Sequence, residues 1–391
     1  ICMLPFVALA CIAVTIFVDD WTAFLPVIVT CMLVALAHIF SYAPRSGLRA
    51  AGYAWLEAWS KVIERLITVC GYILLYWVGS NSVESFALAF LFGALIGLAS
   101  ALLFARATLK PDIDDTKWID LGDCWIDNKS LLIQSLPFAI TLGILPYVIR
   151  IEKFIVAGVV GIDAVALFHV AQIAWLAGLV VPQALRAALL PILGQRRDDE
   201  AQFVKAIEKS LDLCFGLLPV GLFGGAILIQ LLLPVAFPEQ YTDGSLGPSA
   251  VDLFMILLIG WCLTLLATPG YTALQAGPNP WKFTLFIGLV VMFATLCGLL
   301  LVGLMSNTVT TALYAAAVAS TLSSAFLLFT SIHMAKLWSI IRQRRVEFLA
   351  SICIASITCY GFIANSLLVF SGLILFAFIP RGWTAMNSTD F

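Results

Sequence analysis

The chain has 391 residues, of which 62% are hydrophobic and 11% charged, with a net charge of −2. A soluble globular protein is about half apolar and about a quarter charged, so this chain has too little polar material to cover a water-facing surface. The composition therefore predicts an integral membrane protein, and the charge argues against nucleic acid as a partner.

The apolar residues form long continuous runs separated by turn-like or charged breaks. A spanning helix needs about 20 apolar residues, and lipid admits only helices or closed barrels. The runs do not alternate with polar residues, which excludes barrel strands. The sequence thus predicts an all-α polytopic protein. Its twelve predicted spans cover residues 1–18, 22–42, 62–79, 84–106, 130–149, 162–190, 204–235, 249–275, 281–304, 308–335, 347–363 and 366–383.

Two amphipathic segments and one polar segment connect these spans. Residues 47–65 carry Trp55 and Trp59 one helical turn apart, which predicts a short interfacial helix before a span, and residues 203–212 are expected to form another. The polar segment 110–130 is expected to link two helical bundles. Its aspartates do not fit the calcium-binding loop pattern, so no metal site is predicted there.

Basic residues set the predicted orientation. If the connection 43–61 is cytoplasmic, 19 of the 21 Lys and Arg residues lie on the cytoplasmic side. Such a bias is typical of multi-pass membrane proteins and predicts a cytoplasmic C-terminus. The outer side then keeps only Arg150 and Lys153.

Those two cations belong to the stretch RIEKFIVAG (150–158). Arg150 and Glu152 are expected to close the span 130–149, and ionisable residues in spans are candidates for function because their burial needs compensation. Two interpretations are open for Arg150, Glu152 and Lys153. They line a central cavity, or they mark the outer end of the span and pair with lipid headgroups.

The following span carries His169 and Gln172, one turn apart and therefore on one face. They predict either a water-lined cavity or an interhelical hydrogen bond. Arg186 is expected to be an ordinary inner-side anchor, and Gln275 to reach the inner surface by snorkelling. No P-loop, GxSxG or HExxH motif is present, and the ten cysteines show no CxxC pairing, so no catalytic or metal-binding motif is found.

Several short motifs follow one another between residues 135 and 193. A span opens with SLP (135–137) and ends with RIEK (150–153). A glycine-rich turn, AVALF and an inner PQAL…ALLP follow, and an outer PEQY (238–241) and a final helix pair come later. With these motifs the chain resembles the polysaccharide exporters of the multidrug/oligosaccharidyl-lipid/polysaccharide superfamily, the Wzx-like flippases of O-antigen and related lipid-linked oligosaccharides.

The resemblance implies a fold of two pseudo-symmetric six-helix bundles plus two extra C-terminal helices. Family members have fourteen spans, so we expect two spans to be absent before residue 1. The implied domains are a partial N-terminal bundle (1–107), a cytoplasmic linker (108–129), a six-helix bundle (130–336) and a helix pair with a tail (337–391).

The resemblance also implies a function. The expected activity is to flip a polyprenyl-pyrophosphate-linked unit of O-antigen, capsule or exopolysaccharide across the bacterial inner membrane by alternating access, without catalysis. Arg150 and Lys153 would attract the pyrophosphate, Glu152 would pair with them, and His169 and Gln172 would contact sugar or couple ion movement. No cofactor is expected, and proton or sodium coupling stays open. Expected partners besides the substrate are membrane lipid, a polysaccharide polymerase and chain-length machinery.

Two other functions remain open at this point. A cation-coupled multidrug exporter of the same superfamily would need an acidic cavity. A membrane glycan polymerase, ligase or glycosyltransferase would need a large outer loop, but the longest predicted outer connection, 234–248, is too short for a catalytic domain.

Overall fold

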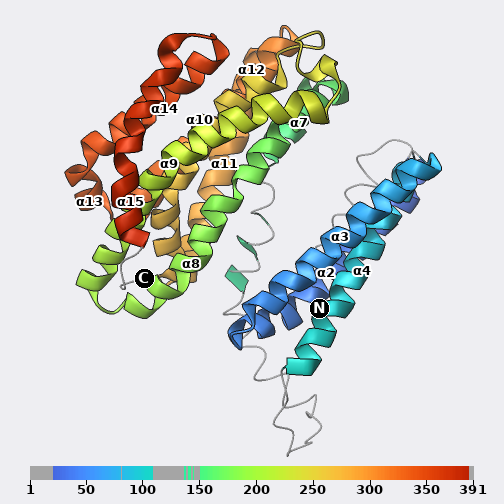
Figure 1. Ribbon diagram of the computed structural model, residues 1–391, viewed down its shortest axis with the longest axis horizontal. Coiled ribbons are helices and arrows are strands. Elements are labelled where there is room, and N and C mark those ends of the chain that lie inside the picture. Colours follow the sequence, from blue (N-terminus) through green and yellow to red (C-terminus); the bar gives the residue numbers. More distant parts are fainter. Residues whose placement is uncertain are drawn as a thin grey trace, which may run out of the picture. The chain divides into compact units, whose positions relative to one another are not determined.

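A computed structural model describes residues 21–80, 82–108, 136–137, 140–141, 144 and 150–386 (Figure 1). All regular structure in these residues is helical, and nine of the described helical segments are long and apolar enough to cross a membrane. The predicted all-α polytopic fold is therefore confirmed. The predicted span 1–18, most of 130–149 and the linker after Thr108 lie outside the described residues.

The chain divides into two compact units, Ile1–Asp120 and Leu121–Phe391. In the first unit, α2 (Trp21–Ala50) and α3 (Ala54–Val78) both pack along α4 (Val83–Thr108). A Cβ atom at Gly97 of α4 would lie 2.7 Å from Glu64 Oε2, and one at Gly93 would lie 2.0 Å from Thr68 Oγ1. This glycine pair, four residues apart, lets α3 and α4 approach closely.

The segment 47–65 does not form the single short helix that was expected. Instead α2 continues to Ala50 and α3 begins at Ala54 and runs on into the predicted span, so residues 51–53 form a tight corner between two helices. The place of this segment at the membrane interface stays a prediction. Gly52 adopts a φ of 86°, a conformation that favours glycine, and the chain reverses there. Charged side chains of the two helices pair with each other, as Arg49 of α2 does with Glu57 of α3. The polar face of each helix is therefore turned partly toward the other helix. Residues 203–212 likewise form part of one long helix, α9 (Glu200–Ala236).

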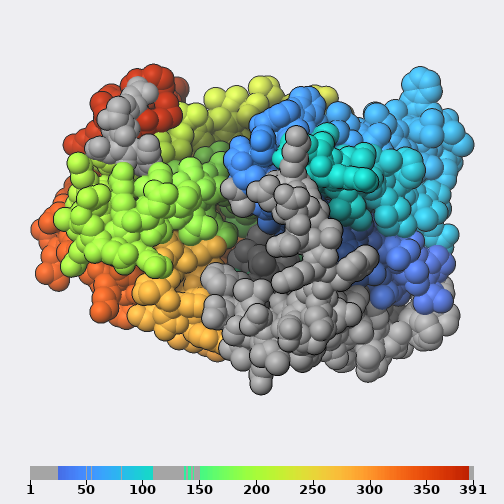
Figure 2. Space-filling view, turned by 90° about the horizontal axis from the view of Figure 1, so that it is seen from below, coloured from blue at the N-terminus to red at the C-terminus, as the bar shows by residue number. Residues whose placement is uncertain are grey.

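The second unit is built around α10 (Ala250–Ala276), which packs against α7, α8, α9, α12 and α14 (Figure 1). Figure 2 shows the α8–α9 corner and α11 on one face of this unit. Its other elements are α6 (Ile151–Val159), α7 (Ile162–Gly178), α8 (Val180–Arg196), α9 (Glu200–Ala236), η1 (Glu239–Tyr241), α11 (Pro280–Leu304), α12 (Val309–Met334), α13 (Trp338–Gln343), α14 (Arg345–Ile363), η2 (Leu367–Phe378) and α15 (Ile379–Met386).

The predicted span 162–190 lies within one candidate span, Ile162–Arg196, whose helix is interrupted at Leu179 between α7 and α8. Pro182 has no N–H group, so it cannot donate to the carbonyl of Gly178 one turn earlier. Trp261 of α10 donates its indole Nε1–H to that carbonyl at 2.7 Å. The same ring packs against Gly221 of α9, where an added Cβ atom would lie only 2.0 Å from it. The proline breaks the helix, and a tryptophan from a neighbouring helix satisfies the freed carbonyl.

The last predicted span, 366–383, also differs in detail. Asn365 has a φ of 46° and reverses the chain after α14. The return segment begins as the 3₁₀ helix η2 and continues as α15. A Cβ atom at Gly361 would lie 2.5 Å from the backbone nitrogen of Val369, so α14 and η2 meet backbone to backbone. Hydropathy predicts one regular α-helix for this segment, whereas its first part is a 3₁₀ helix packed closely against α14.

Candidate functional site

The predicted charge cluster at 150–153 surrounds the start of the short helix α6. Arg150 is the N-cap residue and is exposed, whereas Glu152 is 2% exposed. Lys153 is partly exposed, and its Nζ contacts His169 Nδ1 of α7. Successive residues of a helix point about 100° apart, so neighbouring charges face different surroundings. Of the three charged side chains in this cluster, only that of Glu152 is buried.

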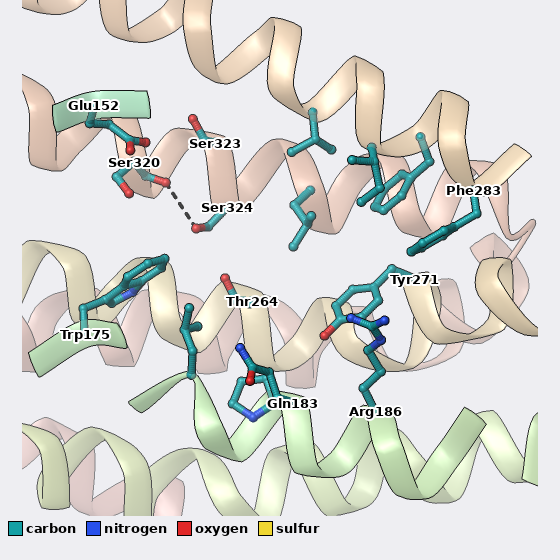
Figure 3. A pocket seen from close by; sticks show the side chains of 16 residues that line it. Glu152, Trp175, Gln183, Arg186, Thr264, Tyr271, Phe283, Ser320, Ser323 and Ser324 are labelled. Atoms are coloured by element: carbon teal, nitrogen blue, oxygen red, sulfur yellow. Dashed lines mark hydrogen bonds between the residues drawn. The ribbon is translucent and has the colours of Figure 1, made fainter. Parts of the chain in front are cut away.

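Glu152 lines a cavity of about 130 Å³ inside the second unit (Figure 3). Side chains from α6, α7, α8, α10, α11 and α12 form its walls. The polar lining residues include Trp175, Gln183, Arg186, Thr264, Tyr271, Ser320, Ser323 and Ser324, and one apolar wall consists of Phe283, Phe286, Ile287 and Val290.

The acidic end of the cavity contains buried polar atoms without a partner. The Glu152 carboxyl group lies beside the Ser320 side chain, and its Oε2 atom accepts no hydrogen bond (Figure 3). The indole Nε1 of Trp175, on α7, is also buried and donates to nothing. Buried polar atoms are normally paired, so an unpaired acceptor and an unpaired donor on one cavity mark a place for water or a ligand.

Helix α12 contributes three hydroxyl groups to this end. Ser320, Ser323 and Ser324 follow helical spacing and are all buried. Ser323 donates to the carbonyl of Ala319 at 2.7 Å, and Ser324 donates to that of Ser320 at 3.1 Å (Figure 3). These hydroxyl oxygens can still accept hydrogen bonds. Their spacing is visible in the sequence, although none of the three was among the predicted site residues.

Arg186 forms the basic end. Figure 3 shows it beside Tyr271, with Glu152 toward the opposite end of the cavity. Its Nε donates to Gln275 Oε1 of α10 at 2.8 Å. Arg186 thus lines the cavity and bonds Gln275, a contact that the sequence did not indicate. That both residues lie at the inner side of the membrane stays a prediction. The break before α8 precedes Arg186 by about two helical turns.

The other predicted site residues lie outside this lining. Gln172 is fully buried in α7, whereas His169 is exposed and contacts Lys153. Arg150, Lys153, His169 and Gln172 are not among the residues that line the cavity. Their role in substrate binding stays a prediction. Within the described residues, no group of three His, Cys, Asp or Glu side chains could hold a metal ion.

Comparison with known proteins supports a transporter. No protein-family model matches the chain. A "Putative O-antigen transporter" of Shigella flexneri is 28% identical over 164 residues, which is 42% of this chain and 38% of that relative. The chain thus matches well under half of the curated relative's length.

The fold also has a solved counterpart. The structure of the lipid II flippase MurJ in an inward closed conformation superposes with a TM-score of 0.59, covering 91% of this chain and 73% of that chain at 12% identity. At an identity this low, the similarity shows only that the two folds are alike. The predicted resemblance is thus confirmed in two independent ways: the chain is a multi-pass membrane protein with a MurJ-like fold and a sequence similar to that of an O-antigen transporter.

Proposed function

We propose that this protein flips a lipid-linked oligosaccharide across the bacterial inner membrane by alternating access. The observation that carries the proposal is the cavity inside the second unit, with the Arg186 guanidinium toward one end and the buried Glu152 carboxyl toward the other. The similarity to an O-antigen transporter and the MurJ-like fold support the same class of substrate.

The lining suits the parts of such a substrate. A guanidinium donates paired hydrogen bonds to phosphate oxygens, so Arg186, oriented by Gln275, would hold the pyrophosphate. Hydroxyl and amide groups such as Ser323, Thr264 and Gln183 would meet sugar hydroxyls. The lipid tail would remain in the bilayer. On this proposal, alternating access would open the cavity to the bulky glycan on one side of the membrane at a time.

Glu152 is the proposed coupling group. A buried carboxylate with an unpaired oxygen is costly, and a proton or a sodium ion removes the charge. Occupation of this site by one cation would stabilise the closed bundle, and its release would favour opening. Glu152→Gln mimics the neutral form, so transport by this variant is expected to lose its dependence on the ion gradient.

Arg186 provides the sharpest test. In a glycan-export complementation assay, Arg186→Ala is expected to lower export at least tenfold, and Arg186→Lys to retain part of it because the charge remains. Arg150→Ala is the matched comparison, as it removes a predicted cation that does not line the cavity. Full export by a well-expressed Arg186→Ala protein would refute this role.

A cation-coupled drug exporter is the second candidate, and the buried Glu152 is the observation that favours it. The two functions separate in one host strain. A drug exporter lowers susceptibility to lipophilic cations and leaves glycan export unchanged, whereas the proposed flippase does the reverse. A flippase also returns its substrate without covalent change, which distinguishes it from a glycan polymerase or ligase.

A further inference from the structure

The corner between α2 and α3 of the first unit holds a second pocket, of about 250 Å³. One stripe of α2 lines it with His38, Ser41, Tyr42, Arg45, Ser46 and Arg49. The facing stripe of α3 adds Glu57, Lys61, Glu64 and Arg65. Both stripes follow helical spacing, so two polar helix faces meet at this corner.

A buried ion pair forms the base of this corner pocket. Arg45 is 8% exposed and Glu64 is 2% exposed. The Arg45 Nη2 donates to Glu64 Oε2 at 2.8 Å, and its Nε donates to Ser60 Oγ at 3.0 Å. His38 Nε2 lies 3.1 Å from Glu64 Oε1. Arg45 is therefore fixed in place, and its charge cannot turn away from the pocket.

The lining carries more positive than negative charge. Four cationic and two acidic side chains line the pocket, which gives a formal charge of +2 with His38 neutral. Both acids already have cationic partners, since Arg49 and Lys61 bind Glu57 and Arg45 binds Glu64. Ammonium and guanidinium groups have more donors than these bonds use. The excess charge suits an anion with several acceptor oxygens.

Aromatic residues mark the depth of the corner in the membrane. Trp55 and Trp59, in the first turns of α3, are 60% and 54% exposed, and Tyr42 beside the pocket is 65% exposed. Exposed tryptophan and tyrosine gather at the membrane–water interface. The candidate span Leu25–Arg49 ends at the same corner. The pocket therefore lies at the depth of lipid headgroups, below which the helices expose apolar side chains.

We propose that the corner pocket binds the phosphate of an anionic phospholipid headgroup. Arg45 at the base and Lys61 and Arg65 at the mouth would donate to its oxygens, and the acyl chains would lie along exposed apolar residues such as Leu66. Basic pockets between helices on the cytoplasmic side commonly bind such headgroups. This site belongs to the first unit and does not depend on the proposed flippase activity.

The test is lipid binding to the purified full chain, measured by native mass spectrometry. Phosphatidylglycerol is titrated against phosphatidylcholine, which has the same phosphate but no net charge. The double variant Lys61→Gln/Arg65→Gln removes the excess charge, yet Glu57 keeps Arg49 and Glu64 keeps Arg45. We expect wild type to prefer phosphatidylglycerol at least tenfold, and the double variant to lose that preference.

Two further variants separate a built site from general attraction. Ser46→Trp keeps every charge and fills the pocket, so it is also expected to lose the preference. Arg106→Gln/Arg197→Gln removes the same charge elsewhere and is expected to bind as wild type does. Equal binding of phosphatidylglycerol by wild type and the Lys61/Arg65 variant would overturn the proposal. So would complete displacement of the lipid by an equal concentration of inorganic phosphate, since the site would then take a free anion.

Discussion

At the residue scale, the side chains that meet at the sites are far apart in sequence. Arg186 bonds Gln275 across 89 positions, and Arg344 pairs with Asp212 across 132. By contrast, the adjacent residues Glu152 and Lys153 face different surroundings. Glu152 is recognisable in the sequence because a charge in an apolar run is conspicuous. The contact between Arg186 and Gln275 is not, because an arginine near a span end has no local feature that reveals its partner.

The indole N–H of Trp175 is the buried donor of the cavity that has no partner, and a substitution tests its role. Trp175→Phe removes a buried N–H that has no partner, so the thermal stability of the purified protein is expected to change little. If a substrate group binds that N–H, transport falls several-fold while stability holds. A large loss of stability together with unchanged transport would mean that the ring is only a packing residue.

Glu57 gives the α2–α3 corner a defined pH dependence. The hydrogen bond from Arg49 lowers the pKa of Glu57 from an ordinary 4.5 to about 2. Because the folded pKa is depressed, the pair stabilises the protein fully above about pH 4.5 and loses this contribution as the pH falls toward 2. The melting temperature of wild type should exceed that of Glu57→Gln at neutral pH, and the difference should shrink in acid. A difference that does not vary between pH 6 and about pH 3 would contradict the pairing.

At the element scale, hydropathy predicts where helices run, because lipid leaves the backbone few alternatives. The interruptions were harder to predict. The break between α7 and α8 needs both Pro182 and the indole of Trp261, which belongs to another helix. The corner at Gly52 was expected to be a surface helix, since its amphipathic spacing fits either structure. The spacing of polar residues along one helix shows that it has a polar face. It does not show whether lipid headgroups or another helix lie against that face.

Two glycines of α9 form a matched pair for testing the tryptophan contact. A Cβ atom at Gly221 would lie 2.0 Å from the Trp261 ring, whereas one at Gly224 meets nothing within 4 Å. Gly221→Ala should therefore destabilise the second unit by about 1–3 kcal/mol, the usual effect of overpacking. Gly224→Ala should be neutral or slightly stabilising. Thermal unfolding in detergent compares them, and equal melting temperatures would show that the ring moves aside freely.

At the scale of the whole molecule, composition and hydropathy predict a multi-pass helical membrane protein, because the bilayer sets both the length and the polarity of each span. Twelve spans were predicted, and the described residues contain nine candidate spans. The motifs between 135 and 193 indicated the superfamily, and the MurJ-like fold agrees with it. Which helices surround the cavity was not predictable. That choice depends on packing around α10, where small, apolar and hydroxyl side chains of many elements fit together.

The proposed flippase function is tested by transbilayer movement in vesicles that contain the purified protein. A fluorescent polyprenyl-pyrophosphate oligosaccharide is placed in one leaflet, and its appearance in the other is followed with a membrane-impermeant quencher. We expect movement well above that in protein-free vesicles, recovery of unchanged substrate, and at least tenfold slower movement with Arg186→Ala. Movement no faster than in protein-free vesicles, with the protein folded and inserted, would contradict it.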